Sequence, residues 1–140
     1  MSALPPAARL VAELPDDASA RLLLFTIRRM GAHGLADAHA ALAVVNAFGL
    51  GFRRPLLLTR AFLADLAGAA RRTIAIAPCC CSRVTGSEQE LLALLIGDVD
   101  TISRRLTARM LLGARQVDHV LASATAVAAA YADAGRPLAG

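Results

Sequence analysis

Apolar residues recur at helical spacing along most of the chain and predict an all-α fold of about six helices. Glycine or aspartate separates consecutive segments, as expected where one helix ends and the next begins. Thr85 and Glu88 have the spacing of a capping box, which predicts a helix directly after them. The predicted helices span about residues 17–30, 36–48, 53–72 and 86–96, followed by one that Asp98 or Asp100 caps and one from Val117 through Tyr131.

Two of these segments have distinctive faces. Residues 36–48 are apolar nearly all round, which is typical of a helix surrounded by others. Within them, His39 and Asn46 share one stripe, which either lines a cavity or satisfies its own hydrogen bonds locally. The face of the fifth segment that is predicted to pack on the core consists of Val99, Ile102, Leu106 and Met110.

Residues 73–82 interrupt the helical pattern. The β-branched residues Thr73, Ile74 and Ile76 lead to Pro78, which disfavours the helical conformation in the residue before it. We therefore expect one extended, partly buried connector here, which could pair with the edge of a partner. Residues 1–15 are expected to form a loosely ordered lead-in, and residues 16–140 a single helical domain, either a bundle or an orthogonal array.

The chain is unusually apolar for its 140 residues, since 56% of them are hydrophobic. A membrane span needs about 17–25 apolar residues without charge. The longest uncharged stretch, residues 38–52, is too short, so no membrane span is expected. The N-terminus lacks the continuous apolar run of a signal peptide, which favours a cytoplasmic location. The alanine-rich helix faces suggest a homo-oligomer or contact with a protein partner.

The net charge of +4 comes from a surplus of arginine, and the chain contains no lysine. Arginine doublets could present guanidinium groups to phosphates if the fold gathered them on one face. One doublet, Arg53-Arg54, has an aromatic neighbour, Phe52, but the others have none to stack on bases, and no recognition motif accompanies them. Nucleic-acid binding is therefore unlikely on this composition.

All three cysteines are consecutive and form the main concentration of candidate chemistry, Cys79, Cys80 and Cys81. In an extended connector, the side chains of Cys79 and Cys81 would point the same way and could share a soft metal ion. Copper(I) would need few further ligands, whereas zinc would need four in all. His33, His39 or His119 could complete such a site, although none has a recognised ligand spacing from the cysteines.

Three other interpretations of the cysteines remain open. A thiol that lies near a predicted helix N-terminus and beside an arginine, here Arg83, has its thiolate stabilised, which favours redox or nucleophilic chemistry. A cysteine-dependent enzyme would also need a histidine partner, for example His119 with Asp118 or His39 with Asp37. Alternatively, the cysteines are small apolar residues that fill a buried bend and are inert.

Four stretches of the chain together resemble a family of small bacterial proteins that is classed only as a domain of unknown function. They are residues 25–30, 33–40, 51–55 and 77–81, that is FTIRRM, HGLADAHA, GFRRP and APCCC. The resemblance covers most of the chain but implies no activity, cofactor or site. On the residues alone, we expect a non-enzymatic helical binding or interaction module that self-associates. Thiol-based copper or zinc binding, redox activity and a cysteine-dependent enzyme are the alternatives.

Overall fold

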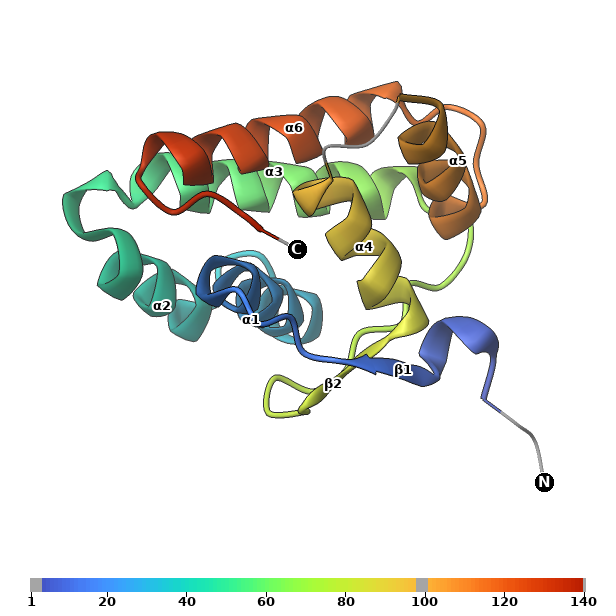
Figure 1. Ribbon diagram of the computed structural model, residues 1–140, viewed down its shortest axis with the longest axis horizontal. Helices are drawn as coiled ribbons and strands as arrows, with labels where there is room; N and C mark the ends of the chain where they lie inside the picture. Colours follow the sequence, from blue (N-terminus) through green and yellow to red (C-terminus); the bar gives the residue numbers. More distant parts are fainter. Residues whose placement is uncertain (1–3, 98–100, 140) are drawn as a thin grey trace.

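The computed structural model describes residues 4–97 and 101–139 and shows the six predicted helices together with a small two-stranded sheet (Figure 1). The predicted all-α fold is therefore confirmed. In chain order, the elements are η1 (Pro6–Ala8), β1 (Leu10–Glu13), α1 (Ala18–His33), α2 (Ala38–Phe48), η2 (Gly49–Gly51), α3 (Arg53–Ala69), β2 (Arg83–Thr85), α4 (Gly86–Ile96), α5 (Thr101–Leu112) and α6 (Asp118–Asp133).

The core forms where α3 and α6 lie side by side and α1, α4 and α5 pack against them (Figure 1). Phe62 and Tyr131 are its largest buried side chains, and both are fully inaccessible to solvent. Burial of large apolar side chains of this kind is the main stabilising contribution to folding. The core also includes Leu23, Ile27, Leu66, Leu91, Leu94, Leu95, Leu111, Leu112, Val117, Val120 and Val127.

Three predicted helix starts are confirmed by their capping hydrogen bonds. The side chain of Asp17 accepts from the Ala20 N–H at 2.8 Å, and that of Asp37 accepts from the Ala40 N–H at 2.9 Å. At the start of α4, the Thr85 hydroxyl accepts from the backbone of Glu88, and the Glu88 carboxylate accepts from the backbone of Thr85. Each cap satisfies N–H groups that have no partner within the helix. The predicted caps of α5, Asp98 and Asp100, lie outside the described residues.

The N-terminal segment carries a strand that the sequence pattern did not reveal. Strand β1 pairs antiparallel with β2, with Glu13 opposite Arg83 and Ala12 opposite Val84, and an irregularity follows Leu10. Beyond the strand, the Gly86 N–H donates to the Arg9 carbonyl at 3.0 Å. Residues 9–13 are thus held by backbone hydrogen bonds against β2 and the first residue of α4. The strand that residues 83–85 form pairs within its own chain.

The predicted core face of α5 is wrong. Ile102, Leu106 and Met110 are 72%, 53% and 62% exposed, and Val99 lies outside the described residues. The helix instead packs through Ala108, Leu111 and Leu112. The reason is that Arg104 turns inward, where its Nη2 donates to the Leu94 carbonyl at 2.9 Å. The side of the helix that carries this arginine therefore faces α4, and the regular apolar stripe faces solvent.

The composition of helix α2 predicted that other helices would surround it, and this prediction is wrong. It packs on α1 and α3 at one end of the molecule, and only Ala40 and Val44 are buried (Figure 1). Leu42 remains 57% exposed. An alanine-rich helix has weak contrast between its faces, so composition alone did not show which side would be covered. Among the described residues, no helix is both long and apolar enough to cross a membrane.

Candidate functional site

A buried ion pair between α1 and α4 positions the cysteine-bearing connector. The side chains of Arg28 and Glu88 are 2% and 0% exposed. Two parallel hydrogen bonds join them, from Arg28 Nε to Glu88 Oε2 at 2.7 Å and from Nη2 to Oε1 at 2.9 Å. Bidentate geometry of this kind is both strong and directional. The pair fixes the orientation of both side chains and leaves their remaining polar atoms facing the connector.

Backbone groups on both sides of the cysteines bind this pair. Arg28 Nη1 donates to the Cys81 carbonyl at 2.8 Å, and Nη2 donates to the Arg83 carbonyl at 2.7 Å. The Glu88 carboxylate accepts from the Ala77 N–H at 3.3 Å. Buried charges are tolerated when they are paired and when hydrogen bonds satisfy their remaining atoms, as they are here. The segment from Ala77 to Arg83 is consequently held at both ends, with the cysteines between.

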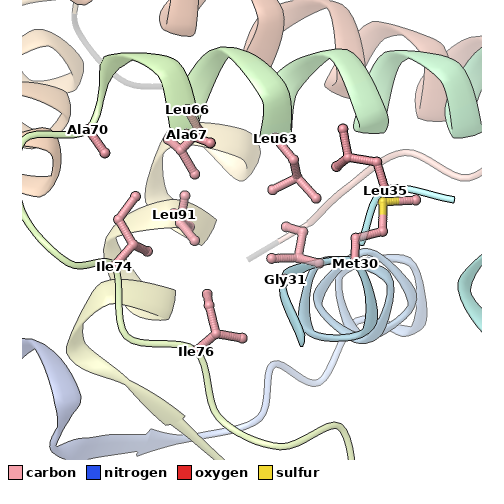
Figure 2. A pocket seen from close by; sticks show the side chains of 11 residues that line it. Met30, Gly31, Leu35, Leu63, Leu66, Ala67, Ala70, Ile74, Ile76 and Leu91 are labelled. Carbon is pink, nitrogen blue, oxygen red and sulfur yellow. The ribbon is translucent and has the colours of Figure 1, made fainter. Parts of the chain in front are cut away.

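A second set of hydrogen bonds holds the connector a few residues earlier. The Ala75 N–H donates to the Ser87 hydroxyl at 3.0 Å, and the Thr85 hydroxyl donates to the Ala75 carbonyl at 2.7 Å. Both backbone groups of Ala75 are thereby satisfied by side chains at the start of α4. Ile74 and Ile76, on either side of it, point into a pocket that faces α1 and α3 (Figure 2).

This apolar pocket has a volume of about 350 Å³ and lies between α1, α3 and the connector. Figure 2 shows Leu63 and Ala67 of α3, and Ala70 directly after it, along one side, with Ile74 and Ile76 of the connector opposite them. Every lining side chain is apolar. The remaining lining residues are Ile27, Met30, Gly31, Leu35, Leu66 and Leu91. An aliphatic cavity of this size is at the lower end of the range for small-molecule sites.

A second hollow of about 480 Å³ adjoins the apolar pocket, and we call it the vestibule. The two hollows share Gly31, Ile74 and Ile76, so those residues form the boundary between them. The vestibule differs from the pocket in chemistry, because polar side chains line it. Its other lining residues are Arg28, Arg29, Ala32, His33, Ala77, Pro78 and Cys79.

The cysteines occupy a turn and not the extended connector that the sequence predicted. The Cys81 N–H donates to the Pro78 carbonyl at 3.0 Å, which closes a four-residue turn. The extended conformation was predicted from Pro78. Proline fixes only its own φ angle, so it does not determine the conformation of the residues that follow it. Cys79 and Cys80 are exposed and Cys81 is half-buried. The prediction that the cysteines fill a buried bend is therefore wrong.

Arg29 joins three of the candidate residues beside the vestibule. Its Nε and Nη2 donate to the two carboxylate oxygens of Asp37 at 3.0 and 2.9 Å, and Nη2 contacts His39 Nδ1 at 2.9 Å. The pKa of Arg29 is raised, chiefly by the hydrogen bond to Asp37 and to a smaller extent by one to the Cys79 thiol. The same guanidinium lowers the pKa of Asp37 to about 2. Arg29 thus holds a carboxylate and an imidazole beside one cation.

The other candidate residues are distributed over the surface. His33 lines the vestibule together with Cys79 and lies close enough to Asp37 to contribute to lowering its pKa. His119 lies at the start of α6, in a separate hollow that Arg71 and Gly113 also line. Asn46 is exposed, so the stripe that it shares with His39 does not line a buried cavity. Across residues 4–97 and 101–139, no three His, Cys, Asp or Glu side chains are grouped so that they could hold a metal ion.

Sequence analysis did not identify the pocket or the role of Arg28. One signal for Arg28 was present, since it follows Leu24 by four residues and therefore shares a face with a core side chain. An arginine on a buried face requires a partner, and Glu88 of the capping box was one available carboxylate. No local signal could place Ile74 and Ile76 against α3, because that contact depends on the tertiary fold.

Comparison with known proteins is consistent with the resemblance seen in the sequence. A model described as a family of unknown function (DUF6628) matches residues 6–130. Neither the curated proteins nor the solved structures include a significant match.

Proposed function

The chain belongs to the family of unknown function DUF6628, and we propose from its own geometry that it is a binding module for a small aliphatic ligand. The ligand would occupy the apolar pocket between α1, α3 and the connector. The observation that carries this proposal is an all-apolar pocket that adjoins a polar vestibule and shares the lining residues Gly31, Ile74 and Ile76 with it.

The composition of the pocket defines what it can bind. No side chain inside it can form a hydrogen bond, so the inserted part of a ligand must itself be without polar groups. Polar groups are available only in the vestibule, where His33 and Cys79 lie. This arrangement favours an elongated molecule with an aliphatic body and one polar end. Core residues Leu66 and Leu91 form part of the pocket wall, so its shape is largely fixed by the fold.

A pocket-filling substitution tests this proposal. Ala67 lines the pocket from α3, and Phe at this position would occupy the space with an aromatic ring. The matched control is Ala61→Phe on the same helix, because Ala61 is also exposed but does not line the pocket. Binding of dodecanol to each protein would be followed by NMR of the isoleucine and leucine methyl groups. Dodecanol is suitable because it has an aliphatic body and an uncharged polar end.

The expected result is saturable shifts at the methyl groups of Ile74 and Ile76 in the wild-type protein and in Ala61→Phe. Ala67→Phe should weaken binding by at least about tenfold, which corresponds to about 1.4 kcal/mol. Equal binding to all three proteins, or shifts confined to residues outside the pocket, would contradict the proposal.

Self-association remains a separate proposal. The exposed stripe of Ile102, Leu106 and Met110 on α5 supports it, because contiguous exposed apolar side chains are typical of contact surfaces. The stripe lies on α5, whereas α1, α3 and the connector form the pocket. The two activities can therefore be tested by independent substitutions.

A further inference from the structure

We propose that the turn between α2 and α3 docks the protein on the surface of an anionic lipid bilayer, where the Leu50 side chain inserts below the lipid headgroups. This inference goes beyond the proposed function and does not depend on it, because the residues of this turn line neither the apolar pocket nor the vestibule. It assigns an interaction surface and one class of partner, a bilayer that the protein binds without crossing it.

The first reason is that the fold holds Leu50 outward. Leu50 is the central residue of η2, and its side chain is fully exposed. The residues that flank η2, Phe48 and Phe52, both pack against the hydrophobic core. The Phe52 N–H donates to the Gly49 carbonyl at 3.3 Å, and Gly49 has a φ of 59°, which favours glycine. The leucine therefore projects from a turn that is anchored on both sides.

Other exposed apolar side chains lie on the two helices that meet at this turn. Leu42 and Val45 are three residues apart on α2 and are both exposed, as is Leu57 on α3. Figure 1 shows that α2, η2 and the start of α3 together form one end of the molecule. An isolated exposed leucine is ordinary, whereas several exposed apolar side chains at one end of a protein are typical of a contact surface.

The charge of this end is the second reason, and it selects the partner. Residues 38–64 contain three arginines but no aspartate or glutamate. Arg54 pairs with Asp133 at the end of α6. The exposed Arg53 has no hydrogen-bond or ion-pair partner in the part of the chain that the structure describes. A projecting leucine beside unpaired positive charge complements an anionic bilayer, because the lipid surface attracts arginine and the acyl region accepts leucine.

Helix stability does not explain why these arginines lie where they do. Arg53 and Arg54 are the first two residues of α3, and the positive end of the helix dipole is unfavourable for cations. No side chain caps this helix start, and its first turn contains no acidic residue. Lipid phosphates would relieve this conflict, because a guanidinium binds phosphate through paired hydrogen bonds.

A second copy of the chain fits the same surface less well. A two-fold interface brings identical patches together, so the arginines of both copies would lie close to one another. Residues 38–64 supply no carboxylate that could neutralise them. A bilayer supplies the negative charge that a second copy lacks.

Co-sedimentation of the full chain with lipid vesicles tests this surface. Vesicles of phosphatidylglycerol and phosphatidylcholine in equal parts are compared with vesicles of phosphatidylcholine alone. We expect the wild-type protein to bind the anionic vesicles and not the neutral ones. Leu50→Gln and Arg53→Gln should each weaken this binding by about fivefold or more, which is the effect expected for one arginine near an anionic surface. Circular dichroism confirms that both variants fold.

The matched controls make the same two changes elsewhere. Leu4→Gln replaces an exposed leucine in the N-terminal segment, which lies away from α2 (Figure 1). Arg115→Gln removes the same charge at an exposed position between α5 and α6. Both controls should bind anionic vesicles as the wild-type protein does.

A fluorescent reporter distinguishes insertion of the turn from simple attraction to surface charge. The chain contains no tryptophan, so Leu50→Trp carries a single indole, and Leu4→Trp is its control. On anionic vesicles, the emission of Leu50→Trp should shift to shorter wavelengths and be quenched by lipids with brominated acyl chains, because the indole enters the interface. Leu4→Trp should show neither change.

Three results would overturn this inference. The first is an absence of binding to anionic vesicles, or equal binding to anionic and neutral ones. The second is an equal loss of binding in Arg53→Gln and Arg115→Gln, since overall positive charge and not this turn would then attract the protein. The third is an unchanged emission spectrum of vesicle-bound Leu50→Trp. Weaker self-association of Leu50→Gln in the absence of lipid would also contradict the proposal, because it would assign the turn to contact between copies of the chain.

Discussion

Arg28 and Glu88 form a buried bidentate ion pair that joins α1 to α4 and binds the connector on both sides of the cysteine turn. These two side chains form four hydrogen bonds with backbone groups, at Ala77, Cys81, Arg83 and Thr85. The position of the cysteine turn and the stability of the fold are therefore coupled through one pair.

Glu88→Gln should lower the free energy of unfolding by about 3–5 kcal/mol, because it leaves the Arg28 charge buried without a counterion. Chemical denaturation measures this effect. The variant should also release the turn, so that the half-buried Cys81 reacts with a thiol reagent faster than in the wild-type protein. The control is Asp133→Asn, which breaks the exposed pair with Arg54 and should change stability by no more than about 1 kcal/mol. Equal effects of the two substitutions would contradict a dominant role for the buried pair.

Gly31→Ala should stabilise the protein and impair the pocket at the same time. Gly31 lies within α1, where alanine is favoured by about 0.5–1 kcal/mol. A Cβ atom at this position would lie 3.7 Å from Ile76 Cγ1, which is an ordinary contact without a clash. The added methyl group would narrow the boundary between pocket and vestibule, and so should weaken dodecanol binding.

Gly68→Ala is the matched control for this substitution. Gly68 lies within α3, and a Cβ atom there would meet nothing within 4 Å. It should raise the thermal midpoint as Gly31→Ala does, while leaving dodecanol binding unchanged. Unaltered binding in Gly31→Ala would mean that the ligand does not pass this boundary.

Asp37 should contribute stability that disappears in acid. Its hydrogen bond with Arg29 is the main reason that its pKa is lowered from 3.8 to about 2 in the folded protein. A carboxyl whose pKa is lower in the folded state stabilises that state above its unfolded pKa, and the contribution is lost as the pH falls toward the folded pKa. The stability difference between the wild-type protein and Asp37→Asn should therefore be constant above pH 3.8 and shrink as the pH approaches 2.

The Asn substitution isolates the charge, because asparagine is also a good N-cap residue and can still accept from the Ala40 N–H. Asp17→Asn makes the same change at the N-cap of α1 and is the control. Urea denaturation at a series of pH values measures both variants. If the wild-type protein remains more stable than Asp37→Asn by the same amount down to pH 2, the ion pair with Arg29 is not the source of that stability difference.

The sequence predicted the helices and their starts well because those features depend on neighbouring residues. Thr85 and Glu88 form the predicted capping box, and Asp17 and Asp37 cap the helices that follow them. A cap satisfies N–H groups within the next three residues, so the signal is local and can be recognised without the fold.

The candidate site was predictable only in part. The cysteine segment was correctly identified as unusual, but its turn depends on Arg28, which is more than 50 residues away in the chain. Strand β1 was missed for a similar reason, since four residues become a strand only where β2 is available for pairing. The pocket also requires contacts between α1, α3 and the connector that no local pattern records.

In helix α5, the spacing of apolar residues predicted the wrong buried face, and this can be tested by substitution. The sequence pattern placed Leu106 in the core, whereas the fold leaves it 53% exposed and buries Ala108 completely. Leu106→Gln should therefore change the free energy of unfolding by no more than about 0.5 kcal/mol. Ala108→Leu, two residues away, should destabilise the protein by about 1–3 kcal/mol because it overpacks the core.

Chemical denaturation of the two variants decides between the alternative faces of α5. A loss of several kcal/mol in Leu106→Gln would restore the stripe of Ile102, Leu106 and Met110 to the core and contradict the observed orientation. Sedimentation of the same variant adds a second readout, since removing one exposed leucine from a contact surface should weaken self-association. Unchanged association of a fully folded Leu106→Gln would exclude this stripe as the surface that joins two copies of the chain.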